Sequence, residues 1–203
     1  MDNSWPFESL VAEKYGVIYV DSPWKYKGHT AKGSGVPQRA KKQHYKTLTL
    51  AELMEFPVSE LALPDCALLM WVTSAHTPQC FSLADHWGFK FSSKVFCWAK
   101  LNKFHGKDAP DKRKLLPIKD NAHWKIGMGR GSRRNTEDCW LFRRGRPKRM
   151  DAGVRELIVD QVGGHSEKPH EAYERIERLF KGPYCELFAR NTREGWDGWG
   201  NEI

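Results

Sequence analysis

The stretch Val17-Ile18-Tyr19-Val20-Asp21-Ser22-Pro23-Trp24 decides the fold of this chain. Its first four residues form a short apolar, partly β-branched run, which is typical of a strand buried on both faces. The run stops at a carboxylate, and the serine and proline that follow favour a turn. The sequence therefore predicts a buried strand that ends at Asp21 in a polar turn.

Short apolar runs farther along the chain predict more strands, and amphipathic segments between them predict helices. We expect strands at Ala67–Val72, Phe89–Trp98, Cys139–Phe142 and Tyr184–Phe188, and helices at Leu50–Leu61 with an interruption at Pro57, Thr77–Trp87 and Pro169–Phe180. Ser166 is a candidate N-cap of the last helix. This alternation indicates an α/β sheet, whose ligands bind at the carboxyl ends of the strands, where Asp21–Trp24 and Ala189–Gly200 are expected.

Length and composition fit one folded domain that spans residues 1–203. Hydrophobic residues make up 40% of the chain, which excludes general disorder. The longest apolar run, Ala67–Val72, is far shorter than the roughly 20 residues of a membrane-spanning helix. The first ten residues lack the pattern of a signal peptide. We therefore expect an intracellular, cytoplasmic protein, located in the host cytoplasm if a phage encodes it.

The positive charge of the chain is concentrated in two segments. Trp24–Lys46 holds seven basic and no acidic residues, and Lys100–Arg149 holds 16 basic and five acidic residues. Both segments contain aromatic residues, which can stack on bases. Solvated loops are the alternative interpretation, but two separate basic segments favour a phosphate-rich partner, namely a nucleic acid. We expect basic loops at about residues 24–46 and 100–135.

The five cysteines give no sign of a metal site. None of them forms a C-x-x-C pair, and the histidines are scattered apart from His165 and His170. A structural zinc site would need clustered ligands. We interpret the cysteines as reduced thiols, most of them buried, and expect no metal.

Three further strings accompany Asp21-Ser22-Pro23-Trp24, which alone would occur by chance in many proteins. They are His165-Ser166-Glu167-Lys168-Pro169, Glu186-Leu187-Phe188-Ala189-Arg190 and Gly195-Trp196-Asp197-Gly198-Trp199-Gly200-Asn201-Glu202. Together and in this order, the four strings resemble the MT-A70 family of S-adenosylmethionine-dependent adenine methyltransferases. The resemblance runs from about Val17 to Glu202. It implies a Rossmann-like sheet with helices on both faces and a permuted order, in which the catalytic motif precedes the cofactor-binding strand.

The resemblance assigns catalysis to Asp21, Ser22, Pro23 and Trp24. In this family the Asp carboxylate and the carbonyl of the next residue accept the two hydrogens of the target amine, and the aromatic residue stacks on the base. The family motif has proline where this chain has Ser22. Serine keeps the carbonyl and gives up only the restriction of φ, so we expect activity to persist. An inactive relative is the alternative.

The resemblance also implies a set of cofactor contacts. Lys168 matches a lysine near the methionine carboxylate, and Asn201 and Glu202 match contacts to the adenosine. Glu186, Phe188 and Arg190 are expected to alternate along one strand and to face the cofactor together, whereas a Glu186–Arg190 ion pair is the alternative. Thr192 and Arg193 fall where some relatives place ribose contacts, although the residue types differ. Lys168 and Ser166 also fit a helix start, which is compatible with binding.

Residues expected to contact the nucleic acid lie in the basic segments. Tyr45, in the string His44-Tyr45-Lys46-Thr47, matches a residue that lines the adenine pocket, although a core aromatic residue is the alternative. The other candidates are phosphate contacts, which set affinity but not sequence preference. They are Arg130, Arg133, Arg134, Arg143, Arg144 and Arg146.

The resulting prediction is an adenine-specific DNA methyltransferase that uses S-adenosylmethionine. The short chain is similar to compact bacterial or phage members of the family, which favours DNA over RNA. The same reaction on RNA and a noncatalytic nucleic-acid-binding subunit remain alternatives. The sequence predicts no membrane partner, and it leaves the oligomeric state open, with a homodimer as one option.

Overall fold

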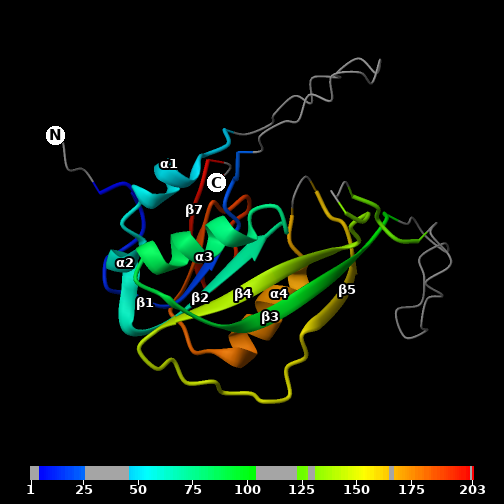
Figure 1. Ribbon diagram of the computed structural model, residues 1–203. Helices are drawn as coiled ribbons and strands as arrows, with labels where there is room; N and C mark the ends of the chain where they lie inside the picture. The colour runs from blue at the N-terminus through cyan, green and yellow to red at the C-terminus, as the bar shows by residue number, and fades with distance from the viewer. Residues whose placement is uncertain (1–4, 26–45, 104–122, 128–130, 165–166, 202) are drawn as a thin grey trace.

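The computed structural model of the chain describes residues 5–25, 46–103, 123–127, 131–164, 167–201 and 203. Within these residues, seven strands form one sheet in the order β5-β3-β4-β2-β1-β6-β7 (Figure 1). The strands are β1 (Tyr15–Val20), β2 (Ala62–Val72), β3 (Lys90–Leu101), β4 (Thr136–Arg144), β5 (Leu157–Gln161), β6 (Tyr184–Leu187) and β7 (Trp196–Trp199). The helices are α1 (Leu50–Met54), α2 (Val58–Leu61), α3 (Thr77–His86) and α4 (His170–Leu179).

Strand direction decides which residues share an edge of the sheet. β1 runs parallel to both β2 and β6, so the segments after these three strands meet at one edge, which we call the carboxyl edge. β4 runs antiparallel to β2 and β3, and its first residues therefore lie at the carboxyl edge together with the end of β3. The last residues of β4 lie at the opposite edge.

The expected strands and helices are present, with small differences at their ends. The predicted helix 50–61 is divided into α1 and α2 around Pro57, as its proline indicated. α3 ends before Gly88, whose φ of 81° suits glycine. β5 and β7 were not predicted. α4 begins at His170 with Pro169 as its N-cap, so the expected capping by Ser166, which lies outside the described residues, is not the arrangement of this helix start.

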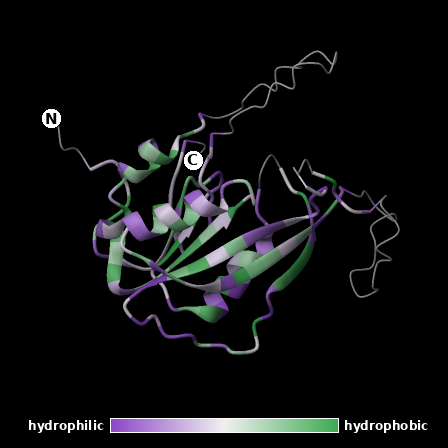
Figure 2. Ribbon diagram, in the orientation of Figure 1, coloured by the Kyte–Doolittle hydropathy of each residue, from purple (hydrophilic) through white to green (hydrophobic). Residues whose placement is uncertain are grey.

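The sheet separates two apolar layers. On one side, Ile18 and Val20 of β1 pack against residues of α1, α2 and α3, and on the other side Val17 and Tyr19 pack against α4. Every residue of β1 is buried, as the unbroken apolar run predicted. Figure 2 shows apolar residues along the strands and hydrophilic residues in many connecting segments. The helices on both faces confirm the predicted Rossmann-like arrangement.

Candidate active site

A cavity of about 470 Å³ opens at the carboxyl edge, beside β1 and β6. The chain leaves β1 for β2 on one side, while β6 joins β1 on its other side. Ligands bind sheets of this kind at such a change of direction. The cavity is lined by Asp21, Glu167, Lys168, His170, Tyr173, Glu186, Phe188, Arg190, Asn191, Thr192, Arg193 and Glu194. It thus brings together the predicted catalytic Asp21 and five of the predicted cofactor residues.

Asp21 follows β1 directly, and its position is therefore fixed by a strand that is buried along its whole length. An oxygen of its carboxylate lies 2.6 Å from Nζ of Lys168. Burial raises the pKa of Asp21, and Lys168 opposes this rise because its positive charge stabilises the carboxylate. The lysine therefore favours the ionised form of Asp21, which can accept hydrogen bonds.

The turn after Asp21 is held by its backbone. The Ser22 carbonyl accepts a hydrogen bond from the Trp24 amide at 2.9 Å, and the Pro23 carbonyl accepts one from the Leu48 amide at 2.7 Å. A carbonyl oxygen has two lone pairs, so Ser22 keeps a site for a second donor. Its hydroxyl is buried and has no hydrogen-bond partner among the described residues.

Trp24 belongs to the core, not to an open surface. Its side chain is 7% exposed, and its ring stacks on His76 with 5.4 Å between ring centroids and 11° between planes. Burial also lowers the pKa of His76, so the ring of this histidine is neutral at physiological pH. His76 thus covers one face of the indole, and the stacking of Trp24 on a base stays a prediction.

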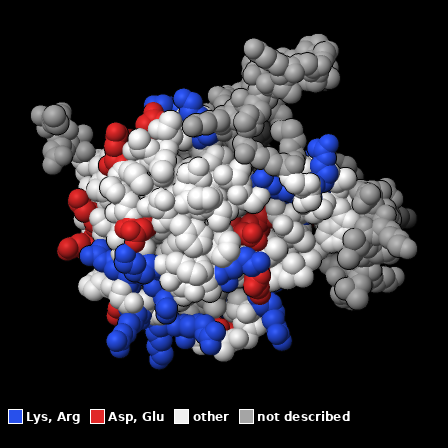
Figure 3. Space-filling model, in the orientation of Figure 1, with Lys and Arg blue, Asp and Glu red and all other residues white. Residues whose placement is uncertain are grey.

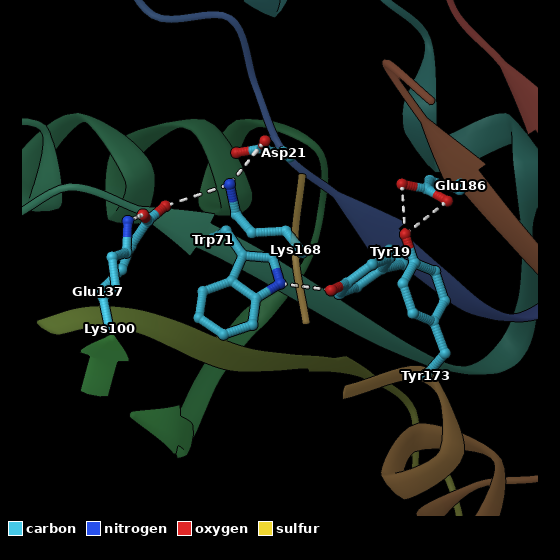
Figure 4. Close-up of polar contacts among 8 residues, drawn as sticks. All are labelled: Tyr19, Asp21, Trp71, Lys100, Glu137, Lys168, Tyr173 and Glu186. Carbon is cyan, nitrogen blue, oxygen red and sulfur yellow. Dashed lines mark hydrogen bonds and ion pairs between the residues drawn. The ribbon is translucent and has the colours of Figure 1, made fainter. Parts of the chain in front are cut away.

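Lys168 lies between two carboxylates (Figure 4). Its Nζ is 2.6 Å from Asp21 and 3.2 Å from Glu137, and Glu137 also pairs with Lys100. Although burial opposes the change, the two lysines lower the pKa of Glu137 to about 2. Burial lowers the pKa of Lys168, but the two carboxylates outweigh it, so the net shift is upward. The ammonium of Lys168, predicted to contact the cofactor, is thus engaged with side chains of this chain.

Glu186 and Tyr173 form the other polar pair of the cavity. The Tyr173 hydroxyl donates to both carboxylate oxygens of Glu186, at 3.0 and 3.1 Å (Figure 4). Burial raises the pKa of Glu186 to about 7, despite the opposing hydrogen bond from Tyr173. Tyr173 was not predicted as a site residue, because nothing in the linear sequence pairs it with Glu186. Glu186 is thus anchored by Tyr173. The alternative stated from the sequence was an ion pair between Glu186 and Arg190.

The remaining cofactor residues reach the cavity by another route than expected. β6 ends at Leu187, and Phe188 has a φ of 61°, so the backbone turns there and strand alternation does not continue to Arg190. Phe188, Arg190 and Thr192 nevertheless line the cavity. Asn201 is exposed and is not among the lining residues, and Glu202 lies outside the described residues.

The predicted phosphate contacts divide between the two edges of the sheet. Arg133 and Arg134 precede β4 and lie at the carboxyl edge, whereas Arg143, Arg144 and Arg146 lie at or just beyond its far end. Arg143 pairs in register with Ala67 of β2, while Asp138 pairs with Val72 next to the site. The five residue steps from Asp138 to Arg143 span roughly 17 Å. Tyr45 and Arg130 lie outside the described residues.

The far-edge arginines have local surroundings of their own. The Arg144 guanidinium donates to the Ser59 carbonyl at 2.6 Å, and the Arg146 amide donates to Asp65 at the same distance. Figure 3 shows Lys and Arg side chains gathered at the lower left and along the lower edge of this view, where Figure 1 places the end of β4 and the segment that follows it. The structure therefore places Arg143, Arg144 and Arg146 at the opposite edge from the cavity, and their role as phosphate contacts stays a prediction.

Neither Glu137 nor Lys100 was singled out as a site residue. Both occur within strands, and only the antiparallel pairing of β3 with β4 brings them together. One feature of the sequence could have indicated Glu137 as a site residue, because it is a carboxylate at the start of an apolar strand. All five cysteines are free thiols, and four are buried. Among the described residues, no cluster of potential metal ligands and no helix suited to crossing a membrane is found.

Comparison with known proteins places this geometry in a family. The MT-A70 family model matches residues 15–202. The Type II methyltransferase M.MunI of a Mycoplasma species is 31% identical over 97% of this chain and 81% of its own length. Human N(6)-adenine-specific methyltransferase METTL4 is 29% identical over 93% of this chain, but over only 37% of its own length. The human N(6)-adenosine-methyltransferase catalytic subunit METTL3 is 26% identical, over 94% and 28% respectively.

The order of the parts agrees with these matches. The strand that carries Asp21 precedes the strand that carries Glu186 in sequence, although the two lie side by side in the sheet. The matched residues include every strand and helix of the described fold and every residue that lines the cavity. The chain therefore belongs to the MT-A70 family of adenine methyltransferases.

Proposed function

We propose that this protein transfers a methyl group from S-adenosylmethionine to the 6-amino group of adenine in DNA. The observation that carries the proposal is the Asp21 carboxylate, which lies at the end of β1 in a cavity shared with Glu186 and Lys168. The similarity to M.MunI, a Type II methyltransferase, covers most of both chains, and it favours DNA as the substrate of this protein. RNA is the second candidate, since the name of METTL3 specifies adenosine.

The chemistry of the lining residues fits S-adenosylmethionine. This molecule combines ribose hydroxyls, an aromatic base, and an amino acid end with a carboxylate and an ammonium group. The cavity offers the Glu186 carboxylate for hydroxyls, Phe188 for apolar contact, and Arg190 and Arg193 for a carboxylate. When bound, the cofactor supplies a methyl group on a positively charged sulfur.

The residues of this chain then act on the amine. The nitrogen of an adenine amine is a poor nucleophile, because its lone pair is delocalised into the ring. Asp21 and the Ser22 carbonyl are adjacent acceptors that can hold its two hydrogens and so orient the lone pair. Asp21 takes up the surplus proton once the nitrogen carries its methyl group. In duplex DNA the amine is base-paired, so the base must first be flipped out of the stack.

A direct assay tests this proposal. The protein is incubated with labelled S-adenosylmethionine and matched DNA and RNA oligonucleotides, and the product nucleosides are identified by mass spectrometry. We expect N6-methyladenine in DNA. Asp21→Asn keeps the shape of the side chain but removes its charge, and it should lower the rate by on the order of 10²-fold or more. Calorimetry should show that this variant still binds S-adenosylmethionine. Wild-type turnover by Asp21→Asn contradicts the assigned role.

A further inference from the structure

Four charged side chains of alternating sign form a chain that leads away from the cavity (Figure 4). Asp21 pairs with Lys168, Lys168 also pairs with Glu137, and Glu137 also pairs with Lys100. The exposed fractions of these four side chains are 17%, 5%, 9% and 23%, in the same order. The two central groups are thus nearly removed from water.

Glu137 and Lys100, the two charged groups farther from the cavity, are not among the residues that line it. Asp21 and Lys168 do line it. Glu137 belongs to β4 and Lys100 to β3, and the pairing of these strands places the two residues behind Lys168. Any influence of Glu137 and Lys100 on the reaction must therefore reach Asp21 through Lys168 or through the negative charge of Glu137, which raises the pKa of Asp21.

Lys168 divides its single positive charge between two carboxylates. Its contact with Asp21 is shorter than its contact with Glu137, 2.6 Å against 3.2 Å. Lys100 stabilises the negative charge of Glu137, so Glu137 attracts Lys168 less strongly. Because groups this deeply buried are poorly screened, the loss of one partner leaves a charge that the others must compensate.

We propose that Glu137 and Lys100 are positioning residues, which act through Lys168 to set the charge and placement of the Asp21 carboxylate. The inference rests on the proposed function, since it assumes that Asp21 accepts the hydrogens of the target amine. It extends the site from the cavity wall to the paired strands β3 and β4.

The chain of alternating charges makes a prediction that depends on sign. In Glu137→Gln, Lys168 keeps one carboxylate partner and neutralises Asp21 more fully, so Asp21 is a weaker acceptor and stays ionised to lower pH. In Lys100→Met, Glu137 draws Lys168 away from Asp21, and Asp21 is protonated at higher pH. Both variants should transfer methyl groups more slowly, but the acid limbs of their pH–rate profiles should move in opposite directions.

The experiment measures single-turnover methyl transfer against pH, with saturating S-adenosylmethionine and enzyme in excess over an adenine-containing oligonucleotide. We expect the acid limb to shift by on the order of half a pH unit, downward in Glu137→Gln and upward in Lys100→Met. Lys100→Arg keeps the charge and should restore the wild-type profile. Lys90→Met is the matched control, because Lys90 begins the same strand and pairs with Asp85 in an exposed position.

The outcomes separate this inference from the proposed function. Opposite shifts, with rescue by Lys100→Arg, support the inference, whereas equal shifts or unmoved limbs overturn it. If Glu137→Gln does not fold, the comparison of Lys100→Met with Lys100→Arg decides alone. Wild-type turnover by Asp21→Asn would overturn the assigned role of Asp21 and this inference with it. An inactive Asp21→Asn beside an unshifted Lys100→Met would overturn only the inference.

Discussion

Glu186 is a carboxyl group that the fold buries near a second carboxylate. Burial raises its pKa to about 7, and Asp21 contributes to the rise. A carboxyl group with a higher pKa in the folded chain than in the unfolded chain binds its proton more tightly when folded. Its contribution to stability is therefore complete below the unfolded pKa of about 4.5 and is lost as the pH rises through about 7.

We expect Glu186→Gln to remove this dependence, because the amide keeps a hydrogen-bond acceptor for Tyr173 but does not titrate. The free energy of unfolding of the wild type, relative to the variant, should fall between about pH 5 and pH 7 by on the order of 1 kcal/mol per unit. Urea unfolding at a series of pH values measures this difference. Parallel stability curves for the two proteins would contradict the buried, titrating carboxyl group.

Ser22 tests which atom of the catalytic turn matters. Its hydroxyl is buried without a hydrogen-bond partner among the described residues, whereas its carbonyl lies beside Asp21 in sequence. An unsatisfied buried hydroxyl costs about 1–3 kcal/mol. We expect Ser22→Ala to be at least as stable as the wild type and Ser22→Pro, the family form, to retain or increase methyl transfer. Thermal unfolding and the oligonucleotide assay check the two expectations, and loss of activity in both variants would assign a role to the hydroxyl.

Single residues show where sequence analysis succeeds and where it stops. Asp21 could be found because an apolar run, a carboxylate and a turn are adjacent in the chain. Glu137 could not be placed beside Lys168, since that contact depends on the direction and register of β4. A linear pattern contains the first kind of information but not the second.

The elements that were predicted are those whose cores are strongly apolar. β5 was missed because Leu157 is exposed and the strand contains Asp160, and β7 was missed because its sequence, Trp-Asp-Gly-Trp, lacks a typical strand pattern. Both lie at the ends of the sheet, where each has one neighbouring strand. Edge strands need little burial on their outer side, so their sequences carry a weak signal.

The segment between β6 and β7 contributes much of the cavity lining, and these two strands pair in parallel. A Cβ atom on Gly200 would lie 2.2 Å from the Ala189 carbonyl oxygen and 2.7 Å from its amide nitrogen. We therefore expect Gly200→Ala to push the end of β7 away from the segment after β6, which lines the cavity. The variant should lose about 1–3 kcal/mol of stability and bind S-adenosylmethionine more weakly.

Denaturant unfolding and calorimetry measure the two effects of Gly200→Ala. Gly131→Ala is the matched control, because no described residue lies within 4 Å of a Cβ atom at that position. Unchanged cofactor affinity in Gly200→Ala would show that the wall does not depend on this close approach.

For the whole molecule, counting charges in the sequence gives the number of basic residues in each segment but not their positions on the fold. The segment Lys100–Arg149 includes the end of β3 and all of β4, so its basic residues are carried from one edge of the sheet to the other. Burial and, to a smaller extent, the charge of Arg134 lower the pKa of His76, the residue that stacks on Trp24 of the catalytic turn. Arg143 and Arg146 are separated from that turn by the length of β4.

The two pairs of arginines should therefore differ in their effect on a short substrate. We compare Arg133→Gln/Arg134→Gln with Arg143→Gln/Arg146→Gln, and leave Arg144 in place because its guanidinium donates to Ser59. The probe is a duplex of about eight base pairs, roughly 27 Å long, with a central adenine.

We expect the first pair to weaken binding and to lower the salt slope by about 0.9 for each lost phosphate contact. The second pair should leave the affinity, the salt slope and methyl transfer unchanged. A duplex centred on Asp21 would have to pass around the sheet to reach Arg143 and Arg146. Fluorescence anisotropy across a range of salt concentrations measures both quantities, and an equal loss in the two pairs would show that the nucleic acid contacts both edges.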